Sequence, residues 1–160
     1  MRKVFSSQFV ATLANVGVII GLVFLVLEIR QANSIATAAT EIEIRSLFSG
    51  LNEAMYSVPG FDELLVKAQS RETTFTPTER IQANGYILRL TNAWQAVEVA
   101  YDSGILPDET FTVIEDDIRG IVSVYPAFAP LLRRNIESYP GQRSRHVYVV
   151  LERVLDEHGY

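Results

Sequence analysis

An uncharged, strongly apolar run near the start of the chain limits its possible folds more than any other feature. It covers Phe9–Leu27, nineteen residues of which thirteen are Leu, Ile, Val or Phe. At about 1.5 Å per helical residue the run is roughly 29 Å long, close to the hydrocarbon thickness of a bilayer, about 30 Å. Apolar residues occur all round the helix from Val16 to Leu27, whereas a core helix of a small soluble domain normally keeps a polar face. The run therefore predicts a membrane-spanning helix.

A cleaved export signal and the buried helix of a soluble domain are the alternatives to this interpretation. Arg2 and Lys3 suit the positive region of a signal, and residues 36–38 form a small-x-small triplet of the kind that signal peptidase accepts. However, the apolar run exceeds the roughly 7 to 15 residues expected of a signal, and Glu28 and Arg30 separate it from the triplet. These features favour a retained anchor.

The orientation of the anchor is not decided by its flanking charges. Arg2 and Lys3 on one side stand against Arg30 and Arg45 on the other, which is close to a tie under the positive-inside rule. We therefore expect a single-pass protein of the cell membrane, with the side of the remaining domain undecided.

Small residues share one face of the predicted span. Ala14, Gly17 and Gly21 fall at three- and four-residue steps, and Gly17 and Gly21 form a G-x-x-x-G pair. In lipid, glycine promotes association because it lets helix backbones approach closely. We therefore predict that Ala14, Gly17 and Gly21 pack against another transmembrane helix, from a second copy or from a different subunit. The alternative is that glycine is simply common in membrane helices.

The rest of the chain is predicted to contain helices and no strands. We expect the first helix to continue out of the bilayer as far as Pro59-Gly60, and further helices over about 61–70, 77–103, 107–125, 126–138 and 144–157. The third has the clearest start, because Thr76-Pro77-Thr78-Glu79 combines a capping box with proline at the first helical position. The sequence thus predicts an all-α fold, an N-terminal transmembrane helix (residues 1–30) continuing into a small helical bundle (residues 31–160).

Apolar residues at three- and four-residue steps predict which faces of these helices enter the core. Trp94, the only tryptophan, lies on such a stripe, and we expect it to anchor the core rather than to form a ligand platform. The stripe predicted for the first helix beyond the membrane contains Ile44, Leu47, Phe48, Leu51, Ala54, Met55 and Val58.

Composition excludes several classes of protein. The chain has no cysteine, so it has no disulfide framework, thiolate metal site or cysteine nucleophile. Its net charge is −5, and residues 28–160 alone carry twelve basic and nineteen acidic side chains, a net of −7. Because sequence-independent nucleic-acid binding draws on a positive footprint, we expect no nucleic-acid partner.

No pattern of catalytic or cofactor-binding residues is evident. His146 and His158 belong to no pair that would present two metal ligands on one helical face, and the chain has neither a phosphate-binding glycine loop nor a Gly-x-Ser-x-Gly elbow. Glu115, Asp116 and Asp117 are consecutive, so on a helix they point about 100° apart and do not converge on one substrate atom. We interpret them as a solvated helix face, and we expect no catalytic residue, no cofactor and no metal ion.

One cluster of basic residues is a candidate contact surface. It lies around the turn at Pro140-Gly141 and includes a single acid, Glu137. If the domain is cytoplasmic, these arginines could meet anionic lipid headgroups or a partner. The alternative is that they pair with the excess acids of the domain or face water. The four residues are Arg133, Arg134, Arg143 and Arg145.

Three short motifs resemble small bacterial single-pass membrane proteins of unassigned function. In those, an N-terminal hydrophobic helix ends in an IRQ-x-N-like signature, as LEIRQAN (27–33) does here, and a later Trp-containing helix precedes a Gly-x-Leu turn. Here that helix is centred on Trp94 and leads into AYDSGILPDETF (100–111), and YPAFAPLL (125–132) follows. Gln95 stands where we would expect an acid after the tryptophan. The resemblance implies the same architecture and no catalytic residue.

Two functions of different class remain after these exclusions. The first, which the anchor and the lack of an active-site pattern favour, is a non-catalytic single-pass membrane protein that binds a partner or serves as an accessory subunit of a membrane complex. The alternative is a membrane-tethered ligand-binding domain or enzyme whose site is built from scattered side chains. A polar pocket at the Trp94 and Tyr101 end of the bundle would favour the alternative, and a solid core there would count against it.

Overall fold

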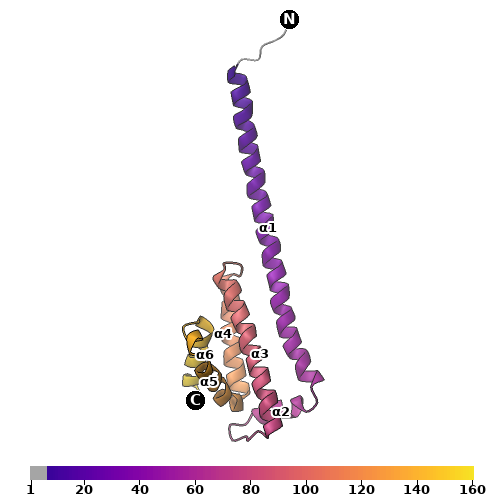
Figure 1. Ribbon diagram of the computed structural model, residues 1–160, viewed down its shortest axis with the longest axis vertical. Coiled ribbons are helices and arrows are strands. Elements are labelled where there is room, and N and C mark those ends of the chain that lie inside the picture. The colour runs from indigo at the N-terminus through magenta and orange to yellow at the C-terminus, as the bar shows by residue number, and fades with distance from the viewer. Residues whose placement is uncertain (1–6) are drawn as a thin grey trace. The chain divides into compact units, whose positions relative to one another are not determined.

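The computed structural model describes residues 7–160, and over these residues it contains helices and no strand (Figure 1). The all-α fold is confirmed, with a long apolar N-terminal helix followed by a small helical bundle. Arg2 and Lys3 lie outside the described residues. The elements in chain order are α1 (Ser7–Ser57), α2 (Phe61–Ala68), α3 (Pro77–Asp102), α4 (Asp108–Val124), η1 (Pro126–Phe128), α5 (Ala129–Ser138), η2 (Pro140–Gln142) and α6 (His146–Glu157).

Local signals set several of the helix ends. After α1 ends at Ser57, Gly60 has a φ of 76°, a conformation that suits glycine because it has no Cβ. At the start of α3 the predicted capping box is present: the Oγ1 of Thr76 accepts from the backbone N–H of Glu79 at 3.3 Å, and the Oε2 of Glu79 accepts from the backbone N–H of Thr76 at 2.8 Å. These are the reciprocal bonds that satisfy otherwise unpaired donors at a helix start.

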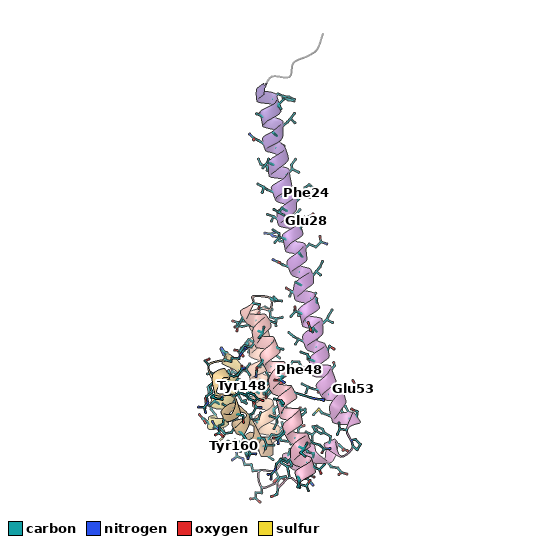
Figure 2. The ribbon with its side chains drawn as sticks, viewed as in Figure 1. Phe24, Glu28, Phe48, Glu53, Tyr148 and Tyr160 are labelled. Carbon is teal, nitrogen blue, oxygen red and sulfur yellow. The ribbon has the colours of Figure 1, made fainter. Side chains whose placement is uncertain are left out.

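The chain divides into two compact units, the first ending at Ala39 and the second covering Thr40–Tyr160. The predicted boundary at residue 30 was placed at the end of the apolar run and stays a prediction. In the first unit every residue from 9 to 36 is exposed. Figure 2 labels two of them, Phe24, which is 63% exposed, and Glu28.

The second unit has a closely packed apolar core. α6 packs against α3, α4 and α5, and α2 packs against α3 (Figure 1). Trp94 has no exposed surface, as expected of a core anchor. Burial of the Tyr86 ring raises the pKa of its hydroxyl to about 12, so this group is neutral at physiological pH. The largest fully buried side chains of the other helices are Leu64, Ile118, Phe128, Leu132, Ile136, Leu151 and Leu155.

The end of α1 contributes a narrower stripe to this core than the sequence predicted. Leu51 is buried, and the partly buried Phe48, labelled in Figure 2, packs against the core. The prediction was wrong for Leu47 and Val58, which are 44% and 37% exposed. Leu47 lies about 100° round the helix from Phe48, and Val58 lies beyond the end of α1. The side chain of Ala54 is outside the described part. The partly buried members of the stripe are Ile44, Phe48 and Met55.

Candidate functional site

The first candidate site is the apolar surface of α1. An 18-residue stretch of α1 has a mean hydropathy of 2.6 and none of it is buried, so α1 is long and apolar enough to span a membrane. Ala14, Gly17 and Gly21, the residues predicted to pack against another helix, are all exposed. A Cβ built on Gly17 or Gly21 would meet no heavy atom within 4 Å. This face therefore has room for a neighbour from outside the chain.

The second candidate site is a groove of about 730 Å³ in the second unit, which we call the α1–α4 groove. Val97 of α3 and Leu106 lie in it, together with residues of two helices. The α4 residues that line it are Glu109, Val113, Ile114 and Asp117. The α1 residues that line it are Glu41, Ile44, Arg45, Phe48, Ser49 and Asn52. The volume is in the range of binding sites, and the lining mixes an apolar surface with charged groups.

Asp117 joins this groove to the core. Its Oδ2 accepts a hydrogen bond from Nε1 of the fully buried Trp94 at 2.7 Å. The interpretation of the acidic run as a solvated face was therefore wrong for Asp117, which is partly buried. Glu115 is partly exposed and pairs with Arg119 and Arg153 at the surface, and Asp116 is exposed. The physical reason is the helical period: Asp117 lies three residues after Ile114 and beside Ile118, on the flank of the buried stripe of α4.

A second, smaller groove of about 450 Å³ lies between α1 and α3. Small side chains line much of it, including Gly50 of α1 and Ala93 and Ala96 of α3. Leu47, predicted to be buried, also lines this groove. Its charged group is Arg89, so it differs from the α1–α4 groove in the sign of its charge.

Packed aromatic rings lie at the end of α3. Tyr101 packs against Phe111 with 5.2 Å between ring centroids, and Phe111 packs against the ring of His146 at 4.5 Å. Nearby, the hydroxyl of Tyr148 bonds Gln95 of α3 at 3.0 Å and Asn135 of α5 at 3.3 Å. These rings fill their part of the core, whereas the α1–α4 groove, lined by Val97, Leu106 and Asp117, opens on the Trp94 side. The ligand-binding or enzyme alternative therefore stays a prediction.

No sequence pattern predicted one pair of residues, a serine and a histidine, whose arrangement resembles that of a nucleophile and its base. Oγ of Ser123 lies 3.1 Å from Nε2 of His158, and Nδ1 of that ring lies 2.8 Å from the carbonyl oxygen of Val154. A neutral imidazole that donates from Nδ1 would accept a proton from the serine. Neither residue lines the α1–α4 groove or the smaller groove between α1 and α3. Thirty-five positions separate the two, and no spacing rule reveals such a pair.

The four arginines of the predicted contact surface fall into two groups. Arg133 bonds Asp156 and the carbonyl oxygen of Tyr160, each at 2.5 Å, and lies 3.8 Å from Glu152. Arg143 lies 3.7 Å from the same glutamate. These two pair with acids of the domain, whereas no ion pair within residues 7–160 involves Arg134 or Arg145. Contact with anionic lipid or a partner stays a prediction.

Within the described residues, no group of three or more His, Asp or Glu side chains is placed to hold a metal ion. The fold and its exposed helix define the class of this protein: over residues 7–160 it is all-α, with one helix that is long and apolar enough to span a membrane. Comparisons with protein-family models, with curated proteins and with solved structures find no match to the chain.

Proposed function

We propose that the chain is a non-catalytic, single-pass membrane protein whose helical domain binds a partner protein, as an accessory subunit of a membrane complex. The observation that carries the proposal is the exposure of the whole apolar stretch of α1, of which nothing is buried in the chain. Thirteen Leu, Ile, Val and Phe residues favour insertion by about 0.3 to 0.6 kcal/mol each, together about 4 to 8 kcal/mol.

The environment of the export-signal triplet supports a retained anchor. Length and composition alone are shared by an anchor and by a signal near the N-terminus. However, residues 36–38 lie inside α1, which ends at Ser57, rather than in an extended segment. The same helix supplies Leu51 and Phe48 to the core of the second unit. The helix therefore contributes to the folded domain beyond the triplet.

Partner binding is supported by the surface of the domain. It offers two grooves bordered by helices, and the described residues contain no metal-binding cluster. Interaction sites combine apolar and polar residues, and the lining of the α1–α4 groove contains both. The partners of the chain under this proposal are the lipid bilayer, another transmembrane helix and the protein held by the domain.

Membrane extraction combined with photo-crosslinking in the native cell tests the proposal. A photoreactive amino acid is placed at Val113, Val66 or Val149, which are 65%, 68% and 51% exposed on α4, α2 and α6. We expect the intact chain to resist alkaline extraction and at least one position to give an adduct of defined mass. Release of the intact chain into water without lipid, or no adduct from any position, would contradict the proposal.

A further inference from the structure

We infer that the α1–α4 groove binds a short amphipathic helix of the partner, apolar on one face and carrying lysine or arginine beside that face. The inference rests on the partner-binding function proposed above and adds the site and the chemistry of the partner. Two observations support it: the excess of acids in the groove, none of which forms an ion pair within the described residues, and the helical spacing of the groove walls.

The charged lining of the groove is mainly acidic. Three carboxylates, those of Glu41, Glu109 and Asp117, stand against one base, Arg45, a formal net charge of −2. The two walls place these acids on both sides of an apolar surface that includes Val97 of α3. The formal charges of Glu41 and Arg45 balance on the α1 wall, so the net negative charge lies on the α4 wall. An acidic or phosphate-bearing ligand would therefore be repelled by the α4 wall, whereas a basic one would be attracted.

Some acids of the domain form ion pairs, whereas others, such as the exposed Glu63 and Asp116, form none within the described part of the chain. Glu79 pairs with Lys67, Glu115 with Arg119 and Arg153, and Glu152 lies near Arg133 and Arg143.

In contrast, the ion pairs found among residues 7–160 involve none of Glu41, Glu109 and Asp117. The known contact of Asp117 is the indole N–H of Trp94, which leaves its negative charge uncompensated. A cation from outside the chain would compensate the two negative charges by which these carboxylates exceed Arg45, the one base of the groove.

The spacing of the lining residues fits a helix. On α1 they fall at positions 41, 44, 45, 48, 49 and 52, one face over about three turns or roughly 17 Å. On α4 they fall at positions 109, 113, 114 and 117. A groove between two helices with apolar positions repeating at three- and four-residue steps receives the apolar face of a third helix through anchors at the same steps. The occupant is thus a helix of about three turns.

A synthetic helix can test this chemistry on the full chain in nanodiscs of zwitterionic lipid. The probe is a peptide of about 14 residues built from leucine and lysine in a helical pattern, and its counterpart replaces every lysine by glutamate. Neither contains tryptophan, so the fluorescence of Trp94, bonded to the groove residue Asp117, reports binding. We expect the leucine–lysine peptide to shift the emission in a saturable manner and the leucine–glutamate peptide to leave it unchanged.

Two variants localise the binding. The triple variant Glu41→Gln/Glu109→Gln/Asp117→Asn removes the three charges but keeps an oxygen that can accept from Trp94. We expect its affinity for the leucine–lysine peptide to fall by about tenfold or more. Val113→Arg introduces a base at an exposed lining position and should have a similar effect. The matched control is Asp116→Asn, which removes an exposed charge next to the groove and should bind like the unaltered chain.

Equal peptide affinity for the triple variant and the control would overturn the inference, as would no binding of the basic peptide. Far-UV circular dichroism confirms that each variant is folded, and Val113→Arg leaves the contact between Trp94 and Asp117 intact. The native-cell crosslinks separate this inference from the function on which it rests. Adducts from Val66 or Val149 without one from Val113 would contradict binding in the α1–α4 groove but not the proposed partner binding. An adduct from Val113 that is lost in the triple variant would support both.

Discussion

The carboxylate of Glu98 on α3 accepts a hydrogen bond at 2.7 Å from the backbone N–H of His146, the first residue of α6. Its second oxygen accepts from the N–H of Val147 at 3.3 Å. The residue before α6, Arg145, provides no side-chain cap, so α3 supplies the acceptor that is missing locally. Glu98 is 3% exposed, and the positive end of the α6 dipole stabilises its charge. The two helices are therefore joined by a polar contact inside the bundle.

Replacing Glu98 by glutamine should destabilise the domain by about 1 to 3 kcal/mol, because the amide has one accepting oxygen where the carboxylate has two. One of the two buried N–H groups of α6 would lose its partner, and the start of the helix would fray. Thermal unfolding of the full chain in detergent, followed by Trp94 fluorescence, measures the change. Asp102→Asn is the control, since it alters an exposed acid on the same helix. Equal losses from both variants would contradict the capping role.

The bond from Trp94 to Asp117 gives a second prediction. Asp117→Ala leaves the indole N–H of a fully buried ring without its 2.7 Å acceptor, which should cost about 1 to 3 kcal/mol of unfolding free energy. Asp117→Asn retains an accepting oxygen and should stay close to the unaltered chain. Circular dichroism at 222 nm follows the unfolding, because the tryptophan itself is perturbed. A stable alanine variant would show that water replaces the lost acceptor.

Features encoded in a few neighbouring residues were predictable. The Thr76 to Glu79 capping box, the stop after α1 at Pro59-Gly60 and the burial of Trp94 all follow from local signals or from helical period. Each depends on backbone geometry within about one turn or on one repeating stripe. The order of the helices follows from such signals alone, so the fold class was readable without knowing which helices meet.

Features that depend on which helices meet were not predictable. Glu98 caps the helix at His146, which is 48 positions further along the chain, and Arg133 bonds Asp156, which is 23 positions further along. No local pattern distinguishes these side chains from solvated ones. Leu47 shows the same limit within one helix. Its spacing is that of a core residue, but the side of α1 that faces the core does not include it. The α1–α4 groove, which combines residues of three helices, was likewise invisible in the sequence.

The stability of the domain should fall on the acid side in part through Glu79 and Glu157. The hydrogen bond with Lys67 lowers the pKa of Glu79, and that with Arg119 lowers the pKa of Glu157, from an ordinary value of 4.5. A carboxyl with a lowered folded-state pKa contributes stability above its unfolded pKa and loses it as the pH falls through the folded value. Both contributions should therefore be complete at pH 7 and disappear below 4.5.

Melting temperatures between pH 7 and pH 3 check this expectation. Glu79→Gln and Glu157→Gln should melt below the unaltered chain at pH 7, and the difference should shrink as the pH falls below 4.5. Glu63→Gln, an exposed glutamate on α2 without an ion pair among the described residues, serves as the control. A difference that stays constant with pH would show that the lost contacts do not depend on charge.

The predicted packing face of α1 can be tested because its glycines have no neighbours within the chain. Gly17→Leu/Gly21→Leu adds bulk where a Cβ at either position would meet no heavy atom within 4 Å, and leucine is the better helix former by about 1 kcal/mol per residue. The helix itself should therefore form at least as well, and any loss of assembly reports a neighbour from outside the chain. We expect the double variant to lose its helix partner, seen as a smaller apparent size after mild-detergent extraction. Ile19→Leu/Val23→Leu changes apolar residues away from that face and should assemble normally, and unchanged assembly of the glycine variant would place the association surface elsewhere.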